Sequence, residues 1–295
     1  MSAALKSDTI NIIDAAATPA LAKLFGQIGK LTTLPASAQR IMEAATDQSA
    51  GAGELLEVIE GDPVLAAKIL RRVNSAFYGL RNRVEDLRSA ISLMGPREIR
   101  NLAFTVYVSR MFDGESSHRD FSREGLWQHC VAVGQAARLV SATCRCEKPD
   151  EAYLAGLLHD MGLILLDQYL PKKLMRVVDA VADGAGTVEA EMSLLPFDHT
   201  QLGAYVAMQW NFPPAVIAAA RYHHDPLFAP KAYRPITSIV AVANYLCHRA
   251  DVTSLGVANI EAPSDDVLSE IQMDQAQLTT IWEQLREALE SSPKM

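Results

Sequence analysis

Residues 155–165 read AGLLHDMGLIL, in which a histidine and an aspartate stand side by side within an otherwise apolar run. The apolar residues predict that this run is buried, as part of a helix over Asp150–Tyr169. An ionised carboxylate that is buried without a partner is prohibitively costly, so Asp160 needs a metal ion, another cation or several hydrogen-bond donors. The pair His159 and Asp160 therefore predicts a fold that brings such a partner to this point.

Further histidines stand in apolar segments before and after the pair. His129 lies among alanines and valines and is expected to face the interior of its helix. His199 is expected in the first turn of a helix that Asp198 caps. The doublet His223 and His224 ends another predicted helix, because an Asp-Pro step follows it.

Two interpretations of this series stay open on the sequence alone. In one, a histidine or a backbone amide satisfies the aspartate and the cluster is a structural polar network, since a lone histidine on an apolar face is most often a core residue. In the other, three or more side chains bind a divalent transition metal such as iron, manganese, zinc or nickel. The candidate metal ligands are His129, His159, Asp160, His199, His223 and His224.

The pattern of apolar residues is helical nearly throughout. Spacings of three and four residues recur over 38–45, 55–59 and 65–73. Asp62 followed by Pro63 places a capping side chain beside a proline suited to a first helical turn. The segment 236–242 contains β-branched residues, but its continuation to Arg249 and the lack of a partner strand favour a helix. We therefore expect an all-α fold, a multi-helix bundle with two lobes.

The polar stretch Asp113–Asp120 is the best candidate for a linker between these lobes. We expect an N-terminal helical extension over 1–30, a first lobe over 31–115, a second lobe over 116–250 and closing helices over 251–295.

Composition limits the classes of function. With 295 residues, 49% of them hydrophobic, the chain can bury one large or two modest cores. It contains neither an apolar run of membrane length nor a secretory signal, so a cytoplasmic location is expected, with no membrane partner. The four cysteines lack the CxxC pairs of a zinc site and are expected to be mainly buried thiols.

The net charge of −8 is unevenly distributed. After Glu115 the chain carries 14 basic and 22 acidic residues, which makes nucleic acid an improbable partner of that half. From Lys68 to Arg110 the chain carries nine basic and three acidic residues. This balance fits a solvated helix face or a docking surface for an acidic partner.

Several motifs of the first lobe resemble the HDOD domain, the HD-related output domain of bacterial signalling proteins. They are Leu34-Pro35, IEGDPVLAAKIL over 59–70, VNSAFYG over 73–79 and AISLMG over 90–95. The histidine series resembles the HD superfamily of metal-dependent phosphohydrolases, most of all the branch with the HD-GYP cyclic-dinucleotide phosphodiesterases. The resemblance implies a regulatory helical domain whose partners are signalling proteins, among them cyclic-dinucleotide enzymes or response regulators.

The chain departs from the enzymes of that superfamily. Catalytic HD sites close with an aspartate in a Val-Ala-Asp setting, whereas Asn244 stands at the matching position here. HD-GYP enzymes follow the His-Asp pair with Gly-Lys, whereas Gly162 is followed by Leu163, and Asp225-Pro226-Leu227 replaces their Gly-Tyr-Pro motif. Each loss of charge weakens a site that must stabilise phosphoryl transfer.

We therefore expect a non-catalytic regulatory domain that acts through protein contacts and keeps a degenerate metal or ligand pocket. The alternative is a metal-dependent phosphohydrolase acting on a cyclic dinucleotide or another nucleotide. Asn74 and Ser75 are expected to end a helix by bonding to the backbone, which is the common use of these residue types, more than to contact a partner.

Overall fold

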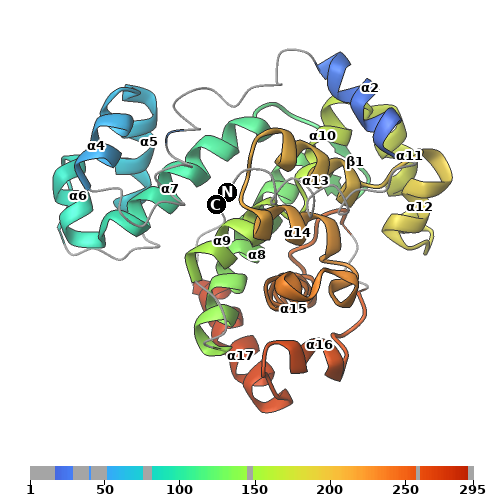
Figure 1. Cartoon of the computed structure of the whole chain (residues 1–295). Coiled ribbons are helices and arrows are strands. Elements are labelled where there is room, and N and C mark those ends of the chain that lie inside the picture. Colours follow the sequence, from blue (N-terminus) through green and yellow to red (C-terminus); the bar gives the residue numbers. More distant parts are fainter. Residues whose placement is uncertain are drawn as a thin grey trace. The chain divides into compact units, whose positions relative to one another are not determined.

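The computed structural model describes residues 17–28, 40, 52–75, 82–144, 149–256 and 260–291, and most of these residues are helical (Figure 1). This confirms the all-α prediction. The chain forms a large unit, Met1–Thr32 with Gly114–Arg286, and a small unit, Thr33–Asp113 with Glu287–Met295. The four-part division over 1–30, 31–115, 116–250 and 251–295 stays a prediction. The helix expected over 38–45 lies outside the described residues apart from Arg40.

The small unit is a group of short helices around an aliphatic core. Its described elements are α4 (Ala52–Glu60), α5 (Pro63–Val73), α6 (Leu87–Met94), α7 (Pro96–Ser109) and the 3-10 turn η1 (Arg110–Phe112). Leu55 and Ile59 of α4 and Leu65 and Ile69 of α5 are at most 1% exposed. Helix α7 packs against α4, α5 and α6, and so completes this core.

Helix α5 starts with the cap that the sequence predicts. Oδ1 of Asp62 accepts hydrogen bonds from the backbone amides of Val64 (3.1 Å) and Leu65 (3.0 Å), and Pro63 occupies the first turn. Oδ2 accepts from Nη2 of Arg110 at 3.0 Å. The bond from Leu65, supported by Arg110, lowers the pKa of Asp62 against the opposing effect of partial burial.

Replacing Asp62 with alanine is expected to lower the free energy of unfolding by about 1 kcal/mol, the usual effect of losing an N-cap. Arg110→Ala removes a partly exposed ion pair and a contact with the Tyr107 ring but leaves the cap in place, and it should lower the free energy of unfolding by less than about 1 kcal/mol. Because the folded pKa of Asp62 is depressed, its contribution is present above about pH 4 and is lost as the pH falls through the folded pKa. Urea unfolding at neutral and acidic pH measures both effects; a neutral-pH stability equal to that of the unaltered chain would contradict the prediction.

Asn74 ends α5 and ties the following loop to it. Nδ2 of Asn74 donates to the carbonyl oxygens of Leu70 and Val84, both at 2.8 Å. Oδ1 accepts from the amide of Val84 at 2.7 Å. These bonds confirm the prediction for Asn74. The prediction for Ser75 is wrong, because its buried Oγ atom has no hydrogen-bond partner among the described residues.

The large unit contains most of the described chain. Its helices are α2 (Thr18–Ile28), α8 (Arg123–Cys144), α9 (Pro149–Leu158), α10 (Met161–Tyr169), α11 (Pro171–Ala182), α12 (Thr187–Leu194), α13 (His199–Gln209), α14 (Pro214–Tyr222), α15 (Arg234–Arg249), α16 (Asp265–Glu270) and α17 (Gln275–Ser291), the last of which belongs to it up to Arg286. Its short elements are β1 (Ser117–His118), β2 (Phe121–Ser122), η2 (Pro226–Phe228) and η3 (Lys231–Tyr233). None of the described helices is both long and apolar enough to span a bilayer.

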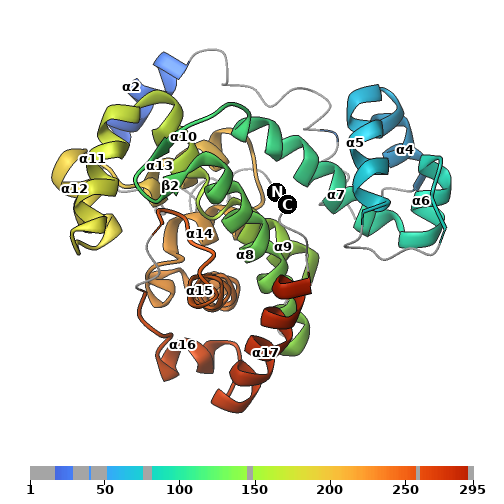
Figure 2. The same ribbon diagram turned by 180° about the vertical axis from the view of Figure 1, so that it is seen from behind.

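The core of the large unit lies where α8, α9, α14 and α15 meet (Figures 1 and 2). Val133, Leu157, Val216 and Ile239, one from each of these helices, are at most 1% exposed. Helix α13 packs against α14 on one side and α10 on the other. The stretch 236–249 is helical within α15, as predicted.

The polar stretch 113–120 stands at the boundary between the units and is fixed to the large one. It contains β1, which pairs antiparallel with β2 just after the stretch. Oγ of Ser116 donates to Oδ1 of Asp167 at 2.6 Å, and Nε of Arg123 pairs with Oδ2 of the same carboxylate at 2.7 Å. Nε2 of His118 lies 2.8 Å from Oδ1 of Asp179. The segment expected to be a linker is therefore anchored to α10 and α11.

The cysteines behave largely as predicted. Cys130 and Cys247 are fully buried free thiols, and burial raises the pKa of both. Cys144 is half-buried, and Cys146 lies outside the described residues.

Candidate metal centre

Six side chains that the sequence singles out converge inside the large unit. They are His129 in the middle of α8, His159 and Asp160 between α9 and α10, His199 at the start of α13, and His223 and His224 directly after α14. All but one are at most 3% exposed; the exception, His224, is open to solvent. The sequence left open whether His223 or His224 points inward. In the structure His223 is buried, and the exposed His224 also turns its Nε2 atom toward the cluster, 3.1 Å from Nε2 of His199.

The prediction of one continuous helix over 150–169 is wrong, because the chain breaks at the His-Asp pair. Helix α9 ends at Leu158, Asp160 has φ −98° and ψ 17°, and α10 begins at Met161. Neighbouring residues of a continuous helix point in directions about 100° apart. The break therefore lets His159 and Asp160 face the same cluster.

Each buried histidine of the cluster is held through its Nδ1 atom. The partners of Nδ1 are the carbonyl oxygen of Val252 for His129 (2.8 Å), that of Gly156 for His159 (2.7 Å), that of Ala219 for His223 (3.2 Å) and Oε2 of Glu191 for His199 (2.7 Å). Such oxygens accept, so Nδ1 carries a proton and Nε2 is the ring atom directed into the cluster. Metal-binding imidazoles are typically oriented in this way.

The first group of candidate ligands consists of His129, His159 and Asp160. The Nε2 atoms of the two histidines lie 3.3 Å apart. Oδ2 of Asp160 lies 3.5 Å from Nε2 of His129 and 3.2 Å from Nε2 of His159.

The second group consists of His199, His223 and His224. Nε2 of His199 lies 3.5 Å from Nε2 of His223 and 3.1 Å from Nε2 of His224. Oδ1 of Asp160 lies 3.4 Å from Nε2 of both His199 and His223. Asp160 thus turns one carboxylate oxygen toward each group.

The charges of the cluster are set by its two carboxylates. Burial would raise the pKa of Asp160, but the charge of His159 and hydrogen bonds from neighbouring imidazoles hold it well below its usual value. Burial would likewise lower the pKa of His199, but the carboxylates of Glu191 and Asp160 hold it well above its usual value. Without a metal ion, His199 therefore carries a proton that metal binding would displace.

Glu191 orients His199 from behind and is fully buried on α12. Oε2 accepts both the Nδ1–H and the backbone amide of His199, at 2.7 and 3.0 Å.

Removing such a partner of a metal-binding histidine typically weakens metal affinity about 10- to 100-fold. We expect a loss of that size in Glu191→Gln, measured by competition with a chromophoric chelator, and none in Glu283→Gln on the exposed face of α17. Equal affinities of the two variants would show that Glu191 only supports the fold.

Asn244 occupies the position where the sequence lacks the expected carboxylate. It is 2% exposed, and its Oδ1 has no hydrogen-bond partner among the described residues. A buried acceptor without a partner is costly, so this oxygen calls for a cation or for a donor beyond those of the described residues.

Sequence reasoning missed two members of the site, Glu191 and His248. Nδ1 of His248 donates to the backbone oxygen of Asn244 at 3.0 Å, and its ring centre lies 4.8 Å from that of His129. Burial, with His129 nearby, lowers the pKa of His248 to about 4, so the ring is neutral. Its spacing of four residues from Asn244 on α15 was a usable signal, because such residues share a helix face. Nothing in the sequence near Glu191 pointed to the cluster.

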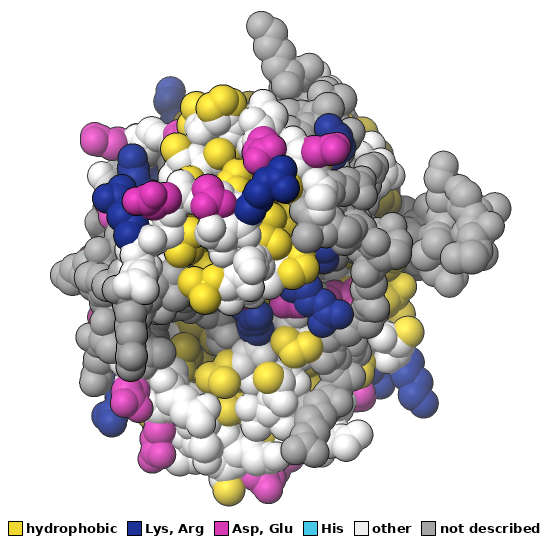
Figure 3. Space-filling model, turned by 90° about the vertical axis from the view of Figure 1, so that its left-hand side faces the viewer, with side chains coloured by type: hydrophobic (Ala, Val, Ile, Leu, Met, Phe, Trp, Pro, Cys, Tyr) yellow, Lys and Arg dark blue, Asp and Glu magenta, His cyan; other side chains and the backbone are white. Residues whose placement is uncertain are grey.

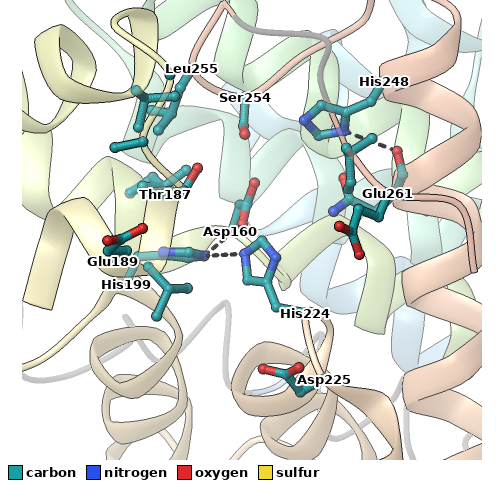
Figure 4. Close-up of a pocket in the computed structure, with 18 residues that line it drawn as sticks. Asp160, Thr187, Glu189, His199, His224, Asp225, His248, Ser254, Leu255 and Glu261 are labelled. Atoms are coloured by element: carbon teal, nitrogen blue, oxygen red, sulfur yellow. Dashed lines mark hydrogen bonds and ion pairs between the residues drawn. The ribbon is translucent and has the colours of Figure 1, made fainter.

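A cavity of about 360 Å³ adjoins the cluster (Figure 4). Asp160, His199, Asn244 and His248 contribute its buried polar groups. The first turn of α12 forms one wall, and exposed carboxylates stand around its mouth. The volume is that of a small-molecule site.

The fold and the cluster define an all-α domain built around buried imidazoles that share one carboxylate. The chain belongs to the HDOD domain family, whose model matches residues 31–226. That range contains all six candidate ligands, whereas Asn244 and His248 lie beyond it.

Comparison with individual proteins agrees with this assignment. An uncharacterized protein of Treponema pallidum (strain Nichols) is 28% identical over 237 residues, which cover 77% of this chain and 44% of that protein. The chain thus spans less than half the length of this curated relative. A solved structure from Marinobacter aquaeolei VT8, provisionally described as a signal transduction protein, matches with a TM-score of 0.81 at 25% identity, over 96% of this chain and 67% of that one.

A second solved structure, from Shewanella amazonensis SB2B and provisionally described as a phosphohydrolase, matches with a TM-score of 0.66 at 22% identity, over 89% of this chain and 97% of that one. At this identity the likeness shows a shared fold. Proteins of similar structure thus carry both signalling and phosphohydrolase descriptions.

Proposed function

We propose that this chain is a regulatory domain of bacterial signal transduction that acts through protein contacts and binds divalent transition-metal ions in its cluster, without phosphohydrolase turnover. Membership of the HDOD family and the likeness to a provisional signal transduction protein support the signalling role. The geometry of the cluster supports the proposal that it binds metal ions.

One observation carries the metal proposal. With bonds of about 2.1 Å, two ligands at tetrahedral angles on one ion lie about 3.4 Å apart. The ligand atoms of the first group are separated by 3.2 to 3.5 Å, and Nε2 of His199 lies 3.1 and 3.5 Å from its two partners. Facing lone pairs at these separations repel one another unless a proton or a cation lies between them.

The residues fit about two ions, because Asp160 offers a separate oxygen to each group. Imidazoles with one carboxylate suit zinc, iron, manganese or nickel. When bound, such an ion supplies Lewis-acid charge. His129 and His159 would hold one ion, and the second group would hold the other.

The surroundings of the cluster disfavour turnover. Leu163 lines the cavity where the HD-GYP enzymes carry a lysine after their glycine, and Asn244 brings no charge. Among the described residues that line the cavity, none is lysine or arginine. A phosphoryl-transfer site depends on positive groups around the phosphate, and the described lining offers no lysine or arginine for this purpose.

A metal-dependent phosphohydrolase acting on a cyclic dinucleotide or another nucleotide is the second candidate. It is favoured by the position of Asp160 between the two groups, because a carboxylate shared by two ions is suited to two-metal hydrolysis.

Elemental analysis of the full chain, purified without chelator or affinity metal, tests the metal proposal. We expect about two divalent ions per chain, as the ligand geometry predicts. A content below about a tenth of an ion per chain, unchanged after incubation with iron, manganese, zinc or nickel, would refute metal binding. The metal-loaded chain should not hydrolyse cyclic dinucleotides or bis-p-nitrophenyl phosphate, and multiple turnovers would favour the second candidate.

The small unit is the proposed contact surface for signalling proteins such as response regulators or cyclic-dinucleotide enzymes. Val64 and Leu93 are each 59% exposed on it, and Arg71 and Arg83 are exposed. On the face seen in Figure 3, apolar side chains are exposed between interspersed basic and acidic ones. Such a mixture suits a protein partner better than a nucleic acid. Capture of partners from a lysate should weaken in Arg71→Ala and Arg83→Ala; full retention would count against this surface.

A further inference from the structure

The cavity beside the cluster has an unusual charge balance. Glu189, Asp225 and Glu261 line it with exposed carboxylates (Figure 4). No lysine or arginine from the described residues opposes them. The two ions proposed above would bring four positive charges, which the five carboxylates of the cluster and the mouth still outnumber.

One buried acceptor that lines the cavity has no hydrogen-bond partner among the described residues. Oδ1 of Asn244 is buried and has no partner among the described residues, although it lines the cavity. His248 lines it too, and because its Nδ1 donates to the backbone, its Nε2 atom is left as an acceptor. Both atoms can accept a hydrogen bond, and the buried Oδ1 of Asn244 requires a donor or a cation.

One feature of the wall favours an anion instead. Gly186 and Thr187 at the start of α12 line the cavity, and that helix has no side-chain cap. A helix N-terminus corresponds to about half a positive charge. The one negative charge that remains after the two ions are counted against the five carboxylates still outweighs this half charge, so the balance of the cavity remains negative.

An adjoining cavity of about 420 Å³ extends the same surface. It shares His224, Asp225 and Glu261 with the first cavity and is lined by Phe228, which is 79% exposed. An exposed aromatic face near carboxylates is a favourable environment for an organic cation. A ligand-binding role would explain why the side chain of Phe228 is exposed and not part of the core.

We propose that this cavity binds an organic cation with an ammonium or guanidinium group, which donates to Asn244 and is balanced by Glu189, Asp225 and Glu261. This ligand rests on the proposed regulatory function of the same site. The cation is either a free small amine or the lysine or arginine side chain of a partner protein. Its N–H groups can donate to Oδ1 of Asn244 and Nε2 of His248. Its positive charge is opposite to that of the carboxylates at the mouth. The proposed ligand is therefore positively charged, whereas a nucleotide phosphate is negatively charged.

Isothermal titration calorimetry of the full chain with agmatine, acetyl-arginine amide and inorganic phosphate tests this inference. We expect saturable binding of at least one cation and none of phosphate. Tighter binding of agmatine indicates a free amine, and tighter binding of acetyl-arginine amide indicates a protein side chain. The titrations are run on metal-free and metal-loaded protein, so a failure of cation binding is separable from a failure of metal binding.

Substitutions at the mouth locate the bound cation. Glu189→Gln and Glu261→Gln should each weaken cation binding roughly threefold, and the double variant about tenfold, in line with exposed ion pairs. Glu283→Gln, an exposed change on α17, should leave the affinity unchanged and controls for the net negative charge of the chain. The inference is overturned if neither cation binds saturably, if the double variant binds as tightly as the unaltered chain, or if phosphate binds more tightly than both cations.

Discussion

Asp160→Ala is expected to leave the purified chain with less than about a tenth of a metal ion, from about two in the unaltered protein. Asp160 is the only carboxylate among the six candidate ligands, and it faces His159 with one oxygen and His199 and His223 with the other. Its loss would leave both proposed ions with neutral imidazoles alone. Elemental analysis of parallel preparations measures this difference.

The variant His159→Ala tests whether two ions share the Asp160 carboxylate or occupy two independent sites. His159 belongs only to the first group, so this variant should lose about one ion and keep the other. Asp266→Ala, on the exposed surface of α16, is the matched control and should keep both. Asp160→Asn, which preserves side-chain volume, shows whether the loss follows from charge or from misfolding. An unchanged metal content in both Asp160 variants would disprove the bridging role.

Gly162→Ala is expected to lower the free energy of unfolding by about 3 kcal/mol or more. A Cβ atom at this position would overlap the backbone carbonyl of His199 and crowd its Cα atom. Backbone atoms cannot swing aside as a side chain can, so α10 and α13 would have to move apart. The same movement would pull Asp160 away from His199.

Urea unfolding of the full chain, followed by circular dichroism, measures this effect. Gly26→Ala is a fitting control, because Gly26 is exposed inside α2 and a Cβ there meets nothing. That substitution should be neutral or stabilise the large unit by up to about 1 kcal/mol. If Gly162→Ala unfolds at the same urea concentration as the unaltered chain, the close approach of α10 and α13 is not essential to the fold.

Features with a local chemical cause could be predicted from the sequence. Asp62 before Pro63 predicted the start of α5, and Asp198 caps α13 through a reciprocal capping box with Gln201. Both signals depend only on neighbouring residues, so the rest of the fold does not change them. The inward direction of His129 followed from its apolar surroundings in the same way.

Features that depend on distant segments could not be predicted. The run around His159 is apolar on every side, so its periodicity gives no sign of the break between α9 and α10. Glu191 reaches the cluster only because α12 packs next to α11 and the chain then turns back into α13. His248 shares a helix face with Asn244, but only the tertiary fold places that face against His129.

The candidate ligands come from four places along the chain, in α8, in the turn between α9 and α10, at the start of α13 and at the end of α14. Ions held there would act as removable cross-links between segments up to 95 residues apart, from His129 to His224. Loading and unloading would then change the rigidity of the large unit without any chemical step. The rigidity of the helices that carry the cluster would then depend on the concentration of available metal ions.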